Sequence, residues 1–156
     1  MPSIKAIKQD GQVFTPSETV KQMLDICAYR LPEKILRKHI MENSCGDGAF
    51  LCEIVKRYCT AFFQTSKDTD RLKNELETYI HGIEINKESH ANCLYNLSKI
   101  VETFGIEDVH WDIPNTDALE CNTFDASMDY LVGNPPYVRV HNLSERYAGV
   151  KKLTFT

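Results

Sequence analysis

Four consecutive residues, Asn134-Pro135-Pro136-Tyr137, have the groups needed to hold the exocyclic amine of an aromatic base. Such an amine, as in adenine, is a poor nucleophile because its lone pair is delocalised into the ring. The Asn134 side-chain oxygen and the Pro135 carbonyl can accept its two N–H bonds and free that lone pair. Tyr137 offers a face on which a flipped base stacks, worth roughly 1–3 kcal/mol. The tetrad therefore indicates chemistry at a base amine.

A glycine turn earlier in the chain provides room for a ligand against the backbone. Gly46 and Gly48 lack a Cβ, and the turn that contains them comes shortly after Glu42. A dinucleotide site would use the fuller G-x-G-x-x-G pattern with an acidic residue about 20 positions later. The third glycine is missing, and Glu84, the next strand-ending acid, lies much farther on. A purely structural glycine turn remains an alternative.

Two acidic residues farther along the chain have the chemistry of nucleoside recognition. Glu84 can accept hydrogen bonds from both hydroxyls of a ribose, and Asp117 can accept one from an adenine amine. Taken singly, each could equally be an ordinary surface carboxylate. They indicate a binding site only through their positions at the ends of predicted strands.

The hydrophobic pattern predicts strands that alternate with helices. Thr15 is expected to cap a first helix, with Pro16 at its first position and Glu18 completing a capping box, and Pro32 is expected to end it. The remaining expected elements are strands 39–42, 79–83, 107–111 and 129–133 and helices 49–63, 71–77 and 88–104. This alternation predicts an α/β fold with a doubly wound, mostly parallel sheet. Ligands of such sheets bind at the carboxyl ends of the strands, where all four groups of residues fall.

The composition is that of one globular domain. The chain has 156 residues, a net charge of -4 and a sequence pI near 5.7, so it is not expected to grip a phosphate backbone by itself. No apolar run approaches the roughly 20 residues of a membrane helix, which predicts no membrane association and a cytoplasmic protein. The six cysteines include no CxxC pair, so free thiols and no metal site are expected.

With these residues in place, the chain resembles the adenine-amine DNA methyltransferases of bacterial restriction–modification systems. Residues 11–16 resemble the amino-terminal motif of that family, residues 42–51 its glycine motif, and residues 82–84 its ribose-binding segment. Asp117-Ala118 resembles the adenine-side segment, and residues 134–137 resemble the catalytic tetrad. The resemblance implies a class I, Rossmann-like methyltransferase fold with S-adenosylmethionine as cofactor and double-stranded DNA as the substrate of the full-length protein.

The resemblance also implies a role for each matching residue. Asn134, Pro135, Pro136 and Tyr137 would be catalytic. The cofactor would be bound by Thr15, Pro16, Glu42, Ser44, Cys45, Gly46, Gly48, Glu84, Ile85, Asp117, Ala118 and Asn134. Thr15 and Glu42 would hold its methionine end. The family needs about three more strands and a recognition region, so residues 1–156 are expected to be a single partial catalytic domain, truncated after about four strands, with residues 1–10 as a loose arm.

Three other functions fit part of this pattern. The same tetrad resembles that of enzymes that methylate RNA adenine or a protein glutamine amide. A nicotinamide-dependent oxidoreductase would use the same sheet, but the missing third glycine and the tetrad count against it. A non-catalytic cofactor-binding lobe is the third possibility. A restriction endonuclease, fused or separate, would be the expected partner, and the fragment alone is expected to be inactive.

Overall fold

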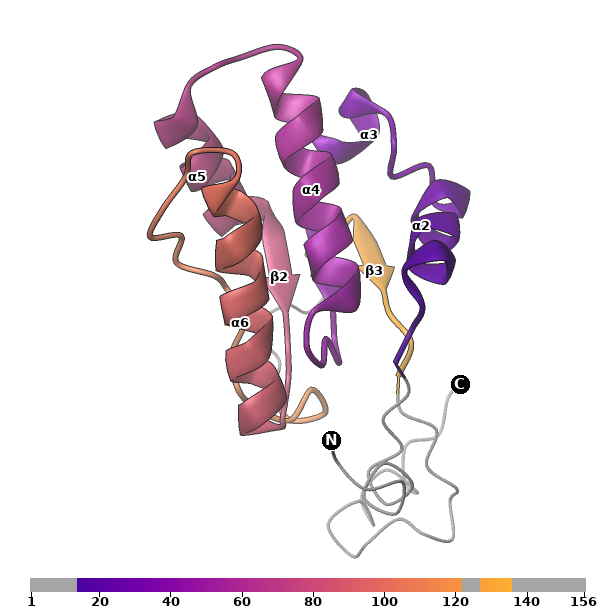
Figure 1. Ribbon diagram of the computed structural model, residues 1–156. Coiled ribbons are helices and arrows are strands. Elements are labelled where there is room, and N and C mark those ends of the chain that lie inside the picture. The colour runs from indigo at the N-terminus through magenta and orange to yellow at the C-terminus, as the bar shows by residue number, and fades with distance from the viewer. Residues whose placement is uncertain (1–13, 122–126, 136–156) are drawn as a thin grey trace, which may run out of the picture. The chain divides into compact units, whose positions relative to one another are not determined.

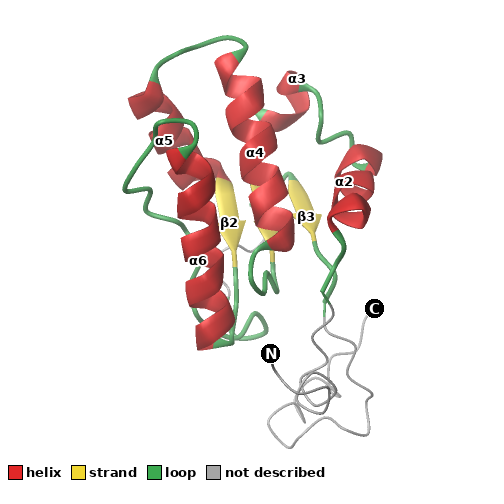
Figure 2. Cartoon of the chain, in the orientation of Figure 1, coloured by secondary structure: helices red, strands yellow, loops and turns green. Residues whose placement is uncertain are grey.

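The computed structural model describes residues 14–121 and 127–135, and within it residues 14–134 form one compact unit. The expected loose arm lies outside the described residues. Figures 1 and 2 show the elements of this unit. They are α2 (Ser17–Ile26), α3 (Pro32–Ile35), β1 (Ile40–Glu42), α4 (Ala49–Phe63), α5 (Thr69–Tyr79), β2 (Ile80–Gly82), α6 (Lys87–Glu102) and β3 (Tyr130–Val132). None of the helices in the described ranges is long and apolar enough to cross a membrane.

The three strands form a parallel sheet in the order β2-β1-β3. β1 is central, and its last residue, Glu42, is paired with Gly82 of β2 and with Val132 of β3. All three residues of β1 are buried, which suits a strand that has a neighbour on both sides. This register brings the carboxyl ends of the three strands level with one another, as the sequence predicted.

The strand predicted at 107–111 is wrong. Asp108 has a φ of 55°, outside the extended region, and the His110 N–H donates to the Glu77 carboxylate at 2.9 Å instead of to a neighbouring strand. Farther on, the chain forms an isolated parallel bridge between His81 and Asp112, and the Glu84 N–H donates to the Pro114 carbonyl at 3.3 Å. The chain therefore runs along the edge of β2 as a loop. This loop brings the next residues, from Asp112 onward, to the carboxyl end of β2.

The first helix is shorter than predicted, and its predicted cap is wrong. α2 ends at Ile26 because Ala28 turns into the left-handed region, with a φ of 58°, and Pro32 begins α3 instead of ending α2. No side chain caps α2: Pro16 precedes its first residue, and the Glu18 carboxylate accepts a hydrogen bond from Lys21 at 3.0 Å. The Thr15 hydroxyl is thereby left for another partner.

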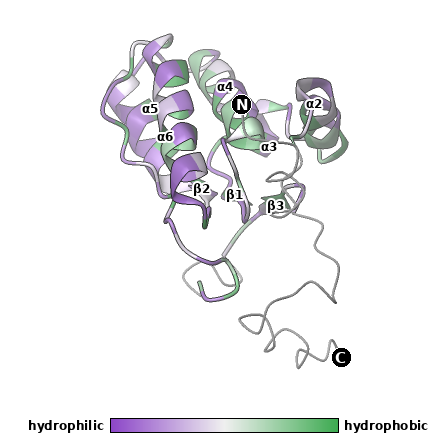
Figure 3. Cartoon of the chain, turned by 60° about the horizontal axis from the view of Figure 1, so that its bottom comes forward, coloured by the Kyte–Doolittle hydropathy of each residue, from purple (hydrophilic) through white to green (hydrophobic). Residues whose placement is uncertain are grey.

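The predicted central helix is confirmed at 49–63. α4 buries eight of its fifteen residues and packs against α2, α3, α5 and α6, so it is the hub of the core. In Figure 3 it carries more green than α5 and α6, on which purple predominates. Figure 1 shows α4 and α6 on the same side of the sheet, so that face of the sheet is covered by helices.

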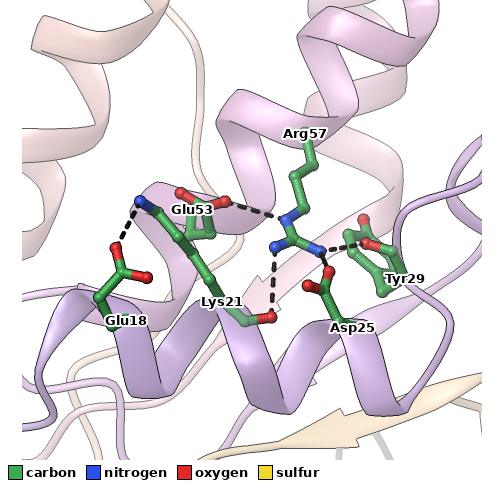
Figure 4. A network of polar contacts seen from close by, with 6 residues as sticks. All are labelled: Glu18, Lys21, Asp25, Tyr29, Glu53 and Arg57. Atoms are coloured by element: carbon green, nitrogen blue, oxygen red, sulfur yellow. Dashed lines mark hydrogen bonds and ion pairs between the residues drawn. The ribbon is translucent and has the colours of Figure 1, made fainter.

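Arg57 of α4 fastens α2 to the core (Figure 4). Its guanidinium donates to the Asp25 and Glu53 carboxylates at 2.7 and 2.9 Å and to the carbonyls of Tyr29 and Lys21 at 2.9 and 3.3 Å. The arginine side chain is only 15% exposed, so these bonds are partly shielded from water. The second half of α2 is consequently held against α4, which follows the glycine turn.

Candidate functional site at the carboxyl ends of the strands

The ends of β1 and β3 are in close contact. A Cβ placed on Gly133 would lie 3.5 Å from Cγ of Glu42 and 3.9 Å from Oδ1 of Asn43. Asn134 follows Gly133, so the first residue of the tetrad leaves the sheet beside the end of the strand that leads into the glycine turn. The sequence predicted this neighbourhood.

Glu84 joins the glycine turn to the end of β2. Its Oε2 accepts the Gly46 N–H at 2.7 Å and its Oε1 accepts the Asn86 N–H at 2.7 Å. The residue is 6% exposed, so these hydrogen bonds are shielded from water. Each carboxylate oxygen has a further lone pair, which leaves acceptor capacity for the two hydroxyls of a ribose.

The two glycines of the turn meet different surroundings. Gly46 has a φ of 53°, and a Cβ built on it would meet nothing within 4 Å. Gly48 has a φ of 90°, and its Cβ would lie 2.7 Å from Sγ of Cys93 in α6. Gly46 therefore borders open space in which a ligand could lie, whereas Gly48 is required for close packing of the turn against α6. Asn96 of α6 supports this packing by donating to the Asp47 carbonyl at 3.0 Å.

Glu42 and Ser44 present polar atoms that have no partner within the described residues. Glu42 is 3% exposed, and its Oε2 and the Ser44 Oγ are both buried without a hydrogen bond there. Burial raises the pKa of the Glu42 carboxyl to about 8, against the opposing effect of the Leu51 backbone amide and with a smaller contribution from the charge of Glu84. Orphaned buried polar groups of this kind are costly unless a ligand completes them.

Cys45 does not add a nucleophile to the site. Its thiol is buried, and the hydrogen bond with Cys93, followed by desolvation, raises the pKa of the Cys45 thiol far above its ordinary value. The neutral thiol packs in the core and contributes shape to the turn. Its backbone N–H donates to the Ile83 carbonyl at 3.0 Å, which again ties the turn to β2.

Asn115 is a residue of this site that the sequence analysis missed. Its side-chain amide donates to the carbonyls of Glu84 at 2.7 Å and Ile85 at 3.1 Å. The loop that carries Asp117 and Ala118 is thus fastened to the end of β2, and the Asp117 Oδ1 accepts the Leu119 N–H at 3.0 Å. In the sequence Asn115 lies between Pro114 and Thr116, a combination that indicates a turn and gives no sign of a binding role.

Exposed apolar side chains flank this loop. Ile85 is 46% exposed and Leu119 is 58% exposed, whereas Ala118 is half-buried. Large apolar side chains next to hydrogen-bonding groups are the usual lining of a site for a planar ring. The end of β2 and the Asp117 loop together supply both kinds of group.

Thr15 and Asn134 meet at the other end of the site. The Asn134 Nδ2 donates to the Thr15 Oγ1 at 3.4 Å, although 119 positions separate the two residues. Pro16 and Pro135 are exposed. Pro136 and Tyr137 lie outside the described residues, so half of the predicted tetrad has no structural description.

Comparisons with known proteins find matches over most of this chain. A family profile described as N-6 DNA Methylase matches residues 3–151. The chain is similar to Type II methyltransferase M.BstVI of Geobacillus stearothermophilus, with 29% identity over 141 residues, covering 85% of this chain and 25% of that protein. It is also similar to Type II methyltransferase M.PaeR7I of Pseudomonas aeruginosa, with 25% identity over 134 residues, covering 83% of this chain and 23% of that protein. The chain thus spans about a quarter of the length of the curated relatives it matches.

Two solved structures show the fold. A nuclease-deletion mutant of the Type ISP restriction-modification enzyme LlaGI, in complex with a DNA substrate mimic, aligns with a TM-score of 0.52 and 19% identity, covering 76% of this chain and 10% of that one. The DrdV–DNA complex aligns with a TM-score of 0.51 and 16% identity, covering 74% of this chain and 11% of that one. Together with the parallel sheet, they confirm the predicted α/β methyltransferase fold.

Proposed function

This chain belongs to the N-6 DNA methylase family, and from that premise we propose that its protein transfers a methyl group from S-adenosylmethionine to the exocyclic amine of adenine in DNA. One observation carries the proposal. The glycine turn, the Glu84 carboxylate and Asn134 lie at the level ends of three adjacent parallel strands. A methyl donor and an amine-binding group placed there would lie at the same edge of the sheet, as methyl transfer between them requires.

The residues at the strand ends fit the proposed cofactor. The buried oxygens of Glu42 and Ser44 can accept hydrogen bonds from the ammonium of a methionine moiety. The open space at Gly46 admits a ligand against the backbone. Glu84 retains acceptors for ribose hydroxyls, and the Asp117 loop has groups for adenine. When bound, the sulfonium supplies an activated methyl group for in-line displacement.

The residues of this chain would prepare the amine for that displacement. In the proposal, the Asn134 side-chain oxygen and the Pro135 carbonyl accept the two amine hydrogens, and Tyr137 stacks on the ring. The contribution is one of positioning and preorganised hydrogen bonding, with no covalent intermediate. The protein would act on double-stranded DNA in the cytoplasm, with a restriction endonuclease, fused or separate, as its partner.

The substrate is tested by offering three methyl acceptors to the full-length protein. Duplex DNA, RNA and a glutamine-containing peptide are each incubated with cofactor labelled in the methyl group. We expect label in duplex DNA, recovered as methylated adenine after digestion, and at most a few per cent of that amount in the other two acceptors. Preferential labelling of RNA or of the peptide would overturn the assignment to DNA.

A matched pair of glycine variants tests the cofactor site. Gly46→Ala is expected to weaken S-adenosylhomocysteine binding by roughly 10-fold, because the new methyl group occupies space proposed for the ligand. Gly105 has a φ of 75°, and its Cβ would also meet nothing within 4 Å, but it lies at the end of α6 away from the strand ends. Gly105→Ala imposes comparable backbone strain and should bind like the unmodified protein in calorimetry. Equal binding by both variants would remove Gly46 from the site.

A further inference from the structure

The loop that follows α6 is fastened to the end of β2, and the last residue that fastens it is Asn115. Just before it, the Glu84 N–H donates to the Pro114 carbonyl at 3.3 Å. The Asn115 Nδ2 then donates to the carbonyls of Glu84 at 2.7 Å and Ile85 at 3.1 Å. Beyond this point in the described chain, the hydrogen bonds of residues 116–121 remain within the loop itself.

The two partners of Asn115 fix the orientation of its amide. A backbone carbonyl only accepts hydrogen bonds, and the amide nitrogen is the only donor of an asparagine side chain. The nitrogen has two hydrogens, one for each carbonyl, and the reverse orientation would place an oxygen against two other oxygens. Asn115 is an exposed residue, so alanine at this position removes the two hydrogen bonds without leaving a cavity in the core.

Asp117 lies two residues beyond Asn115 and is half-buried. Its Oδ1 accepts the Leu119 N–H at 3.0 Å, and its carbonyl accepts the Glu120 N–H at 3.1 Å. These bonds hold the carboxylate relative to its own loop, but they do not hold the loop relative to β2. A carboxylate has acceptor sites beyond the one that Leu119 uses, so an adenine amine could still donate to it. The place of that acceptor beside β2 therefore depends on Asn115.

We propose that Asn115 is a positioning residue that sets how strongly the cofactor site selects adenine over a base without the exocyclic amine. It acts by holding the Asp117 carboxylate at the carboxyl end of β2, where Glu84 would bind the ribose. A carboxylate that accepts an amine hydrogen rejects the corresponding oxo base, whose oxygen would face it. The proposal rests on the proposed function, because it assigns Asn115 to the adenine end of the S-adenosylmethionine site.

The test compares S-adenosylhomocysteine with S-inosylhomocysteine, in which an oxo group replaces the adenine amine. Calorimetry with the full-length protein gives the ratio of the two affinities. We expect the unmodified protein to bind the adenine ligand roughly 30-fold more tightly, the effect of one hydrogen bond to a charged group. Asn115→Ala should lower this ratio to about fivefold or less. A residue with a merely structural role would change both affinities alike, so an unchanged ratio in Asn115→Ala would overturn the proposal.

A double-mutant cycle establishes whether Asn115 acts through Asp117. Asp117→Ala should lower the ratio to about twofold or less, and adding Asn115→Ala to it should lower the ratio no further. If the two changes lower the ratio independently of each other, Asn115 does not act through Asp117 and the proposal is wrong. Asn74→Ala removes an exposed asparagine of α5 as a matched control, and it should keep the unmodified ratio.

Two further measurements separate the possible failures. Thermal unfolding establishes that each variant is folded, and Asn115→Leu provides a second variant of similar shape with no hydrogen to donate. A folded Asn115→Leu protein with the unmodified ratio would also overturn the proposal. If the unmodified protein binds S-adenosylhomocysteine but does not distinguish it from S-inosylhomocysteine, the role of Asn115 is excluded and the proposed function stands. If the unmodified protein binds neither ligand, the proposed function itself fails.

Discussion

Replacing Asn134 with alanine is expected to lower the rate of methyl transfer to DNA by roughly 100- to 1,000-fold, the usual effect of removing one preorganised hydrogen bond from a reacting centre. The side-chain oxygen is the acceptor that would draw a hydrogen of the adenine amine away from the ring plane, and alanine offers none. Single-turnover assays with labelled cofactor measure the rate, and calorimetry with S-adenosylhomocysteine measures binding. Binding should change by less than about threefold, since Glu42, Glu84 and the glycine turn are untouched.

A second asparagine-to-alanine variant, at a position away from the strand ends, serves as a control. Asn74 is an exposed residue in the middle of α5, away from the strand ends, and Asn74→Ala makes the same chemical change. It should transfer methyl groups at the unmodified rate. Undiminished transfer by Asn134→Ala, with Asn74→Ala alongside as the reference, would mean that the tetrad does not hold the substrate amine.

Binding of S-adenosylhomocysteine is expected to strengthen by roughly 50-fold between pH 6 and pH 8 because of Glu42. Burial raises the pKa of this carboxyl to about 8, so the ligand-free protein holds it in the protonated form at pH 6 and about half ionised at pH 8. An ammonium group is bound best by the ionised form, so below pH 8 the proton must be released at a cost of tenfold per pH unit. Titration calorimetry in two buffers of different ionisation enthalpy should also detect the released proton.

The Glu42→Gln variant removes that titration. The glutamine has the same shape and no ionised form, so its affinity should stay near the low-pH value of the unmodified protein across the whole range. Glu84, a buried acid whose charge contributes to the raised pKa of Glu42, is unchanged in this variant. Any difference between the two proteins therefore comes from Glu42. If the affinity of Glu42→Gln rises with pH as steeply as that of the unmodified protein, Glu42 is not the group that binds the amine.

Glu42 should also make the ligand-free protein less stable as pH rises. The pKa of its carboxyl is raised from 4.5 to about 8 by folding, so the folded state binds this proton more tightly than the unfolded state. The stabilisation is complete below pH 4.5 and is lost as pH rises to about 8, by up to roughly 5 kcal/mol. The burial of this carboxyl therefore weakens the ligand-free protein at neutral pH.

Much of this fold could be predicted from residue patterns, because strong local signals agreed with the tertiary structure. α4 has an apolar stripe that runs without interruption from the glycine turn, and its predicted bounds are those observed. β1 and β2 are short buried runs, β1 ending at Glu42 and β2 just before Glu84, and β3 is followed by Gly133. Since parallel strands end at one edge of a sheet, the placement of Glu42, Glu84 and Asn134 at that edge followed from the order of elements.

The predictions that were wrong concern segments in which side chains form hydrogen bonds that the expected structure would have made differently. At 107–111 the sequence alternates as a strand does, but the Glu77 carboxylate binds the His110 N–H, and Asp108 leaves the extended region. At the start of α2 the residues of a capping box are present, but Glu18 pairs with Lys21. Asn115 was missed for a related reason, because its two acceptors are backbone carbonyls and no residue type identifies them in advance.

The double hydrogen bond of Glu84 means that the two halves of the proposed cofactor cannot be recognised independently. One oxygen accepts the Gly46 N–H and the other accepts the Asn86 N–H, so a ribose bound to this carboxylate would share its oxygens with the glycine turn. Free energies contributed by the nucleoside and amino-acid portions of a ligand should for this reason be cooperative, with the whole bound more tightly than the sum of its parts. In the proposed site, a single carboxylate would thus join the ribose-binding segment to the glycine turn.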